Sequence, residues 1–228
     1  MYFSLITPEP GCEIAAAHEW MQDAYGEHQW LWKFFPTPDG SRRDFLFRRS
    51  DLGDVPRFYV LSKRQPRGLS SAWRVQSREF APRLEIGDKL QFDLRANPVV
   101  TISSDGKSKR HDVVMQEKKR LLQERGLARW DDWRSEDRPS LYVLARKTSA
   151  RWLIERGERL GFSIDEENLS VDAYQQHRGK KETLRFSTVD FSGTLTVQNP
   201  EVFTGALCAG IGHAKAFGCG LMLVRRKD

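Results

Sequence analysis

The chain has 228 residues, enough for one large domain or two small ones. Its 37 Lys and Arg residues against 31 Asp and Glu give a net charge of +6, which suits a polyanion such as nucleic acid. The three cysteines, Cys12, Cys208 and Cys219, lack the spacing of a disulfide framework or a zinc site. The sequence shows no signal peptide and no run of about 18 apolar residues that could span a membrane. We therefore expect a protein of the reducing cytoplasm.

Residues 1–97 are predicted to form a first α+β domain. Residues 2–6 alternate as in a strand, and residues 13–35 have helical periodicity, with a break near Gly26 and an end at Pro36. Short β-like segments follow at 44–47, 57–63, 72–80 and 89–94. The aromatic residues of 30–35 are expected in the core. Strand, helix and several strands together indicate a small α+β sandwich.

Residues 98–110 are polar and contain glycine, which predicts a basic linker or mobile loop. The element order then repeats in residues 111–228, with a strand at 112–115, helices at 116–125 and 148–160, strands at 169–174, 184–189 and 193–197, a helix at 200–209 and a last strand at 220–225. Residues 126–139, rich in Trp, Asp and Arg, look like an insertion. The repeated order predicts two similar α+β domains in tandem.

A glycine-rich loop precedes the last strand. Gly210, Gly212, Gly218 and Gly220 allow sharp turns and close approach of the backbone to another group. Backbone N–H groups of such a loop, with His213 and Lys215 beside them, can bind phosphate oxygens. The alternative is a turn that only packs the last helix against the last strand. Neither common mononucleotide fingerprint fits the loop.

Four blocks of the chain resemble one known family. Residues 23–36 (DAYGEHQWLWKFFP) resemble the pattern D-x-Y-x-x-H-x-x-L-W-x-x-F-P, and residues 43–48, 94–98 and 210–221 resemble three further blocks. The family is the CRISPR-associated repeat-processing endoribonuclease of the CasE type. This sequence departs from it in a long stretch at 8–21 and in the insertion at 126–139.

The resemblance implies two tandem ferredoxin-like (RRM-like) domains with a C-terminal glycine-rich loop. It implies a metal-independent nuclease without a cofactor, which cleaves the CRISPR repeat stem-loop of precursor RNA, keeps its product (the crRNA) and joins other Cascade subunits. We expect neither binding to a membrane nor direct contact with DNA. The alternatives are a subunit that binds the RNA hairpin without cleaving it, and an enzyme that acts on a small phosphorylated molecule.

The resemblance places the catalytic residues at His28 and Tyr25. Histidine suits metal-free attack by a 2′-hydroxyl, because its pKa lies near neutral pH. A spacing of three puts both side chains on one face of a helix. Lys33 is expected to stabilise the negative charge of the phosphate. The alternative is that His28 merely packs beside Trp30 and Trp32.

The hairpin stem is expected to be bound through its shape and its phosphates. The expected RNA-binding residues are Arg95, Lys107, Lys109, Arg110, Arg178, Lys180, Lys181, Gly210, Gly212, His213, Lys215 and Gly218.

Overall fold

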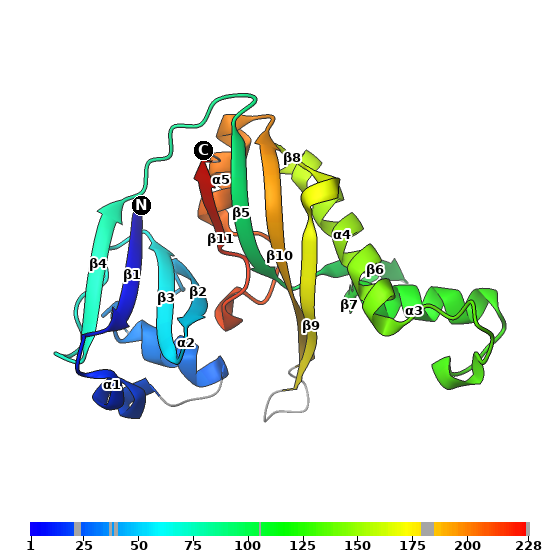
Figure 1. The fold of residues 1–228 in the computed structure, drawn as a ribbon, viewed down its shortest axis with the longest axis horizontal. Helices are drawn as coiled ribbons and strands as arrows, with labels where there is room; N and C mark the ends of the chain where they lie inside the picture. The colour runs from blue at the N-terminus through cyan, green and yellow to red at the C-terminus, as the bar shows by residue number, and fades with distance from the viewer. Residues whose placement is uncertain (21–23, 37, 39–40, 105, 179–184, 227–228) are drawn as a thin grey trace. The chain divides into compact units, whose positions relative to one another are not determined.

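A computed structural model describes the chain except for residues 21–23, 37, 39–40, 105, 179–184 and 227–228 (Figure 1). The chain divides into two compact units. One consists of Met1–Leu84 with Thr204–Met222, and the other of Glu85–Phe203 with Leu223–Asp228. Each unit contains its own antiparallel sheet. None of the described helices has the length and apolar character needed to cross a membrane.

The first unit is built on a four-stranded sheet in the order β2-β3-β1-β4. Its elements in chain order are β1 (Tyr2–Pro8), α1 (Glu13–Trp20), α2 (Ala24–Trp32), β2 (Phe45–Leu52), β3 (Val55–Ser62) and β4 (Trp73–Glu79). The first and third strands lie at the centre and β2 lies at an edge, which is the strand order of a ferredoxin-like domain. Residues 63–72, which follow β3, contain no helix.

Aromatic side chains fill the core of the first unit. Trp30, Phe34 and Phe35, from α2 and the turn after it, are at most 1% exposed. The Trp30 ring lies 4.5 Å from that of Trp73 and 5.0 Å from that of Phe58, centroid to centroid. The predicted core positions in residues 30–35 are therefore confirmed, except that Trp32 is only partly buried. Two helices, α1 and α2, occupy the segment expected to be helical, but Gly26 lies inside α2 and does not mark the junction between them.

The second unit repeats the strand order. Its sheet runs β11-β5-β10-β8, and β9 also pairs with β10. The elements are β5 (Lys89–Ala96), α4 (Leu141–Arg159), β8 (Phe162–Ile164), β9 (Ser170–Arg178), β10 (Arg185–Val197), α5 (Pro200–Ala209) and β11 (Met222–Arg226). The strands β8 and β9 share the place of the second ferredoxin-like strand. The predicted fold of two tandem ferredoxin-like domains is confirmed.

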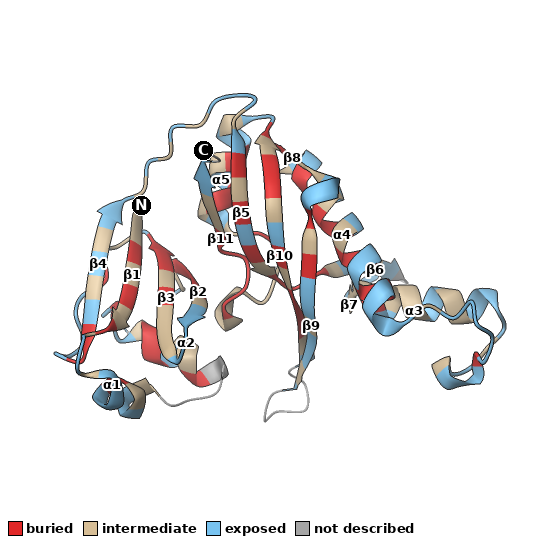
Figure 2. Cartoon of the chain, viewed as in Figure 1, coloured by how far each residue is buried: buried red, intermediate tan, exposed pale blue. Residues whose placement is uncertain are grey.

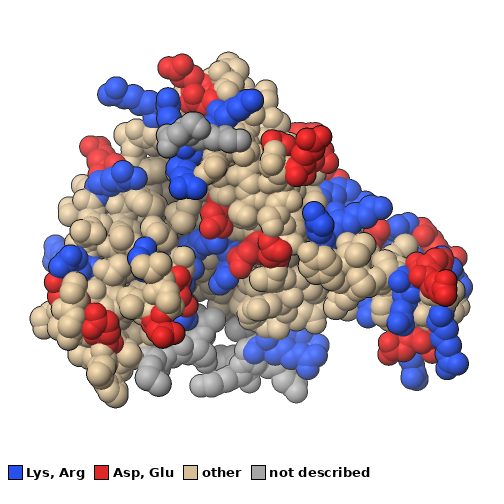
Figure 3. Space-filling model, viewed as in Figure 1, with Lys and Arg blue, Asp and Glu red and all other residues tan. Residues whose placement is uncertain are grey.

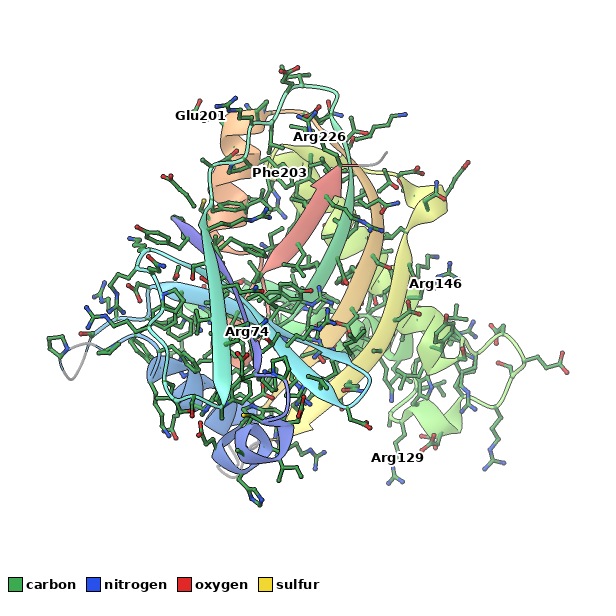
Figure 4. All side chains as sticks on the ribbon, turned by 60° about the vertical axis from the view of Figure 1, so that its left-hand side comes forward. Arg74, Arg129, Arg146, Glu201, Phe203 and Arg226 are labelled. Atoms are coloured by element: carbon green, nitrogen blue, oxygen red, sulfur yellow. The ribbon has the colours of Figure 1, made fainter. Side chains whose placement is uncertain are left out.

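Buried side chains run along β10, which pairs with β5, β8 and β9 (Figure 2). Residues 185–189 and 193–197, which were expected as two strands, are parts of this one strand, and residue 184 lies outside the described residues. On α5, Phe203 is fully buried and packs against Phe162, with 5.0 Å between ring centroids (Figure 4). Near the end of β11, Arg226 lies 3.4 Å from a carboxylate oxygen of Asp88.

The division between the units differs from the predicted boundaries. The strand expected at 89–94 was assigned to the first domain, but β5 pairs with β10 from Lys89↔Thr196 to Ala96↔Val189. The first unit therefore ends at Leu84, and the glycine-rich loop belongs to it and not to a domain of residues 111–228. Local periodicity indicates a strand but does not reveal which sheet it joins.

The predicted linker is a β-hairpin of β6 (Val99–Ser104) and β7 (Lys107–Asp112). The strand expected at 112–115 is wrong, because Asp112 is the N-cap of α3 (Val113–Glu124) and accepts a hydrogen bond of 2.8 Å from the Met115 N–H. The same carboxylate accepts hydrogen bonds from the hydroxyls of Tyr174, at 3.2 Å, and Ser187. Asp112 thereby fixes the end of the hairpin to the second sheet.

The Trp-rich insertion forms a small packed structure beyond α3. Trp133 is buried, and the Arg125 guanidinium lies 4.0 Å from the centre of its ring. The Trp133 indole N–H also donates to Asp137, at 2.9 Å. These contacts explain the composition of residues 126–139 by local packing.

Candidate active site

His28 lies on α2 among three aromatic rings. Its imidazole is 6.1 Å from Trp32, 5.9 Å from Phe45 and 6.5 Å from Phe47, centroid to centroid. The Nε2 atom is buried and has no partner among the described residues, and Nδ1 makes no described hydrogen bond either. Burial, and second the positive charge of Arg43, lower the pKa of His28 to about 4. The imidazole is therefore neutral at pH 7 and able to accept a proton.

The structure places the other two predicted catalytic residues on the same segment. Tyr25 and His28 both belong to α2, as their spacing of three requires, although the Tyr25 side chain lies outside the described part of the structure. Lys33 directly follows the last residue of α2 and is exposed. The catalytic roles of all three stay predictions.

The glycine-rich loop is closed by its own hydrogen bonds. The Ile211 N–H donates to the Gly220 carbonyl at 2.8 Å, and the Lys215 ammonium donates to the Ala209 carbonyl at 2.7 Å. The backbone has positive φ at Ala214 and at all four loop glycines, with 82° at Gly212. Lys215 thus has a structural contact within the loop, in addition to the phosphate contact predicted for it.

The loop contacts both faces of the edge strand β2. A Cβ on Gly210 would lie 2.8 Å from a methyl carbon of Leu46, and a Cβ on Gly218 would lie 3.3 Å from the ring of Phe47. Successive residues of a strand point to opposite faces, so the loop wraps around the sheet edge. Close packing against β2 thus explains why residues 210 and 218 are glycines. The sequence analysis had offered a different packing role, a turn that packs the last helix against the last strand, as the alternative to phosphate binding.

Phe47 connects the two motifs that were predicted separately. Its ring is stacked on His28, at 26° between the planes, and it also packs against Gly218. Residues 28 and 218 therefore meet at one side chain of β2, all within the first unit. The sequence analysis missed this connection, because nothing in the local pattern of residues 45–48 indicates what each face contacts.

The predicted basic residues of the second unit lie on its hairpins. Lys107, Lys109 and Arg110 are exposed on β7, and Arg178 is exposed at the end of β9. Lys180 and Lys181 lie outside the described residues. On the face shown in Figure 3, basic and acidic side chains are interspersed. Their RNA contacts stay predictions.

Arg95 differs from the other predicted RNA-binding residues. Its guanidinium donates two hydrogen bonds, of 2.8 and 2.7 Å, to the carboxylate of Asp190, which faces it on β10. This bidentate geometry is the strongest that an Arg–carboxylate pair adopts. A phosphate would have to compete with Asp190 for Arg95.

Arg43 is a residue of this region for which the sequence analysis proposed no role. It is half-buried, and its Nη1 is buried without a hydrogen-bond partner in the described part of the chain. Burial lowers the pKa of its guanidinium. In the sequence, Arg43 stands only as the first residue of the resembling block 43–48, and this does not reveal its burial.

The comparisons with known proteins identify the family. The sequence model of a family described as "CRISPR associated protein" matches residues 1–226. The chain belongs to this CRISPR-associated family. The Cascade subunit CasE of Escherichia coli K12 is 27% identical over 212 residues, which cover 92% of this chain and 96% of CasE. The CRISPR-associated endoribonuclease Cse3 of Thermus thermophilus is 29% identical over 157 residues, or 64% of this chain and 59% of Cse3.

Solved structures agree with the fold. The CRISPR endoribonuclease Cse3 bound to a 19-nucleotide RNA matches with a TM-score of 0.68 and 23% identity over 98% of each chain. Cas6e of Escherichia coli K-12 matches with a TM-score of 0.61 and 21% identity over the whole of both chains. The resemblance to the CasE type, noted from four blocks of sequence, is confirmed.

Proposed function

We propose that this chain is a metal-independent endoribonuclease that cleaves the repeat stem-loop of CRISPR precursor RNA and stays bound to its product as a Cascade subunit, in the cytoplasm. The observation that carries the proposal is the neutral His28 imidazole, which stacks on Phe47 next to the glycine-rich loop. The relatives support it, since one is named a Cascade subunit and another an endoribonuclease.

In the proposed reaction, His28 acts as the general base. It takes the proton from the 2′-hydroxyl of the RNA, whose oxygen then attacks the adjacent phosphorus. The bond from phosphorus to the 5′-oxygen breaks, and a proton from Tyr25 or from water goes to this leaving oxygen. The products are a 2′,3′-cyclic phosphate and a 5′-hydroxyl end. Because Nε2 of His28 is buried, Nδ1 is the nitrogen that accepts the proton.

Fixed positive charge and backbone donors would stabilise the transition state. Lys33 extends from the end of α2, where an ammonium can approach a phosphate oxygen. The N–H groups of the glycine-rich loop would supply further donors beside Phe47. The hairpin stem would be held by the exposed basic residues of β7 and by Arg178, which bind phosphates without reading the base sequence.

The experiment is to incubate the purified chain with repeat RNA from the neighbouring CRISPR array in excess chelator, scoring binding and cleavage separately. We expect cleavage within the repeat, with product masses that fit a 2′,3′-cyclic phosphate and a 5′-hydroxyl. Binding without cleavage would instead support a hairpin-binding subunit. Nucleotide binding that the repeat RNA does not displace would instead favour an enzyme for a small phosphorylated substrate.

A further inference from the structure

We propose that Arg43 is a further residue of the active centre and that its guanidinium binds a non-bridging oxygen of the scissile phosphate beside His28. This inference rests on the proposed function, and it assigns to Arg43 a role that neither its sequence context nor its spacing from His28 suggests.

The first step is the position of Arg43 on the sheet. The Lys63 N–H donates to the Asp44 carbonyl at 3.2 Å, so the pairing of β2 with β3 continues one residue before Phe45. Alternation along a strand then places residue 43 on the same face as Phe45 and Phe47. Both of these rings contact His28. Arg43 thus extends the row of side chains against which the imidazole packs.

The second step is that the described part of the chain supplies no counter-ion for Arg43. The adjacent carboxylate of Asp44 is occupied by Arg64, through hydrogen bonds of 2.6 and 3.0 Å. Glu27, next to His28 on α2, pairs with Arg49 at 3.0 Å. Within the described residues, Arg43 forms no ion pair, and its buried Nη1 donates no hydrogen bond.

The third step is energetic. A guanidinium that is partly removed from water and left without a partner is costly, and such a cost is typically retained where a ligand supplies the missing partner. Nη1 of Arg43 and Nε2 of the neighbouring His28 are both buried without a hydrogen-bond partner in the described part of the chain, and Arg43 carries the positive charge of this pair. An anion with several acceptor oxygens fits the guanidinium of Arg43 at this position. Arg is also the side chain whose donor geometry matches phosphate.

The charge of Arg43 also acts on His28. Burial is the larger cause of the lowered pKa of the imidazole, and the positive charge of Arg43 is the second cause. Arg43 therefore adds to the effect of burial in favouring the neutral imidazole before RNA arrives. A bound phosphate would neutralise Arg43 and accept hydrogen bonds from its guanidinium, at the point where negative charge develops during the reaction.

The test compares Arg43→Gln with Arg42→Gln, since Arg42 is the adjacent arginine and is exposed. At saturating protein, we expect Arg43→Gln to lower the single-turnover cleavage rate about 100-fold or more. We expect Arg42→Gln to stay within about threefold of the wild-type rate. The affinity of Arg43→Gln for a hairpin with a 2′-deoxy nucleotide at the cleavage site should change less than tenfold. A wild-type rate for Arg43→Gln, or equal losses in the two variants, would overturn the proposal.

A second measurement is independent of cleavage and separates this inference from the proposed function. The NMR signal of the His28 ring is followed while inorganic phosphate is added. The signal should shift in wild type and in Arg42→Gln, and it should not respond in Arg43→Gln at the same phosphate concentrations. The proposed function fails if wild type does not cleave repeat RNA in chelator. The Arg43 site fails if the phosphate response survives in Arg43→Gln or is absent from wild type.

Discussion

The imidazole of His28 is stacked on the ring of Phe47, with 6.5 Å between the centroids and 26° between the planes. The same Phe47 ring leaves space for a hydrogen atom but not comfortably for a methyl group at Gly218. Phe47 thus joins α2 to a loop nearly two hundred residues further along the chain. Since packed side chains transmit displacements to their neighbours, a change in the loop is expected to move His28.

The first prediction concerns Gly218→Ala. Its φ of +74° is strained for any residue with a Cβ, and that Cβ would press on Phe47 at 3.3 Å. We expect the free energy of unfolding to fall by about 1–3 kcal/mol and single-turnover cleavage to fall with it. Urea titration and quenched cleavage assays measure the two effects.

The matched control is Gly205→Ala. Gly205 lies in α5, is exposed, and a Cβ there would meet no atom within 4 Å. This variant should be neutral or more stable by about 0.5–1 kcal/mol, with an unchanged cleavage rate. Equal behaviour of the two variants would show that Gly218 is not constrained by Phe47.

The second prediction is the titration of His28. Burial and the charge of Arg43 lower its pKa from the ordinary 6.5 to about 4, so its ring NMR signal should titrate with a midpoint near 4. Between about pH 6.5 and 4, the unfolded chain binds more protons at this position than the folded chain. Its contribution to the free energy of unfolding must therefore decrease as the pH falls through this window.

The comparison is with His28→Phe, which keeps an aromatic ring in the cluster. Relative to this variant, wild type should lose stability as the pH is lowered from about 6.5 towards 4 and show no pH-dependent difference above that window. A titration midpoint of the His28 ring signal near pH 6.5 would mean that the imidazole is as accessible to solvent as in a peptide. The assignment of His28 as the general base would then lose its support.

The third prediction concerns Asp112→Ala. This substitution removes the N-cap of α3 and the hydrogen bonds from Tyr174 and Ser187. Loss of the cap alone should lower the free energy of unfolding by about 0.5–2 kcal/mol. Amide hydrogen exchange in β7 should accelerate, because the hairpin loses its attachment to the sheet.

Asp131→Ala is the control for Asp112→Ala. Asp131 is exposed, and its side chain makes no hydrogen bond within the described residues. It should change the free energy of unfolding by no more than about 0.5 kcal/mol. If exchange in β7 is as fast in this variant as in Asp112→Ala, the attachment is not made by Asp112.

The fourth prediction concerns the basic hairpin. Replacing Lys107, Lys109 and Arg110 by Gln should weaken binding to repeat RNA. It should also reduce the slope of log affinity against log salt by about 0.7–0.9 for each lost phosphate contact. The control removes the same charge at Lys119, Arg129 and Arg134, which are exposed in α3 and the insertion (Figure 4 labels Arg129). An equal change in slope for both triple variants would indicate non-specific attraction.

Some features of the fold were accessible from sequence because they are local. The helical periodicity of residues 24–35 places Trp30 and Phe34 in the core, and glycine-rich composition identifies the loop at 210–220. The β6–β7 hairpin was missed because most of its side chains are polar on both faces, so no apolar alternation marks it as two strands.

Other features depend on contacts between distant residues. The membership of β5 in the second sheet follows from pairs such as Leu94 with Phe191, which no local pattern encodes. The candidate site shows the same limit. His28 and Gly218 were both singled out, but their meeting at Phe47 and the burial of Arg43 exist only in the folded chain.

The most direct test of the account is single-turnover cleavage of repeat RNA by His28→Ala in excess chelator, with hairpin affinity and thermal unfolding measured on the same preparation. We predict that cleavage falls by at least about 100-fold while the affinity for the hairpin stays within a few-fold of wild type. Cleavage at the wild-type rate, or a loss of cleavage matched by an equal loss of binding in a folded variant, would contradict a catalytic His28.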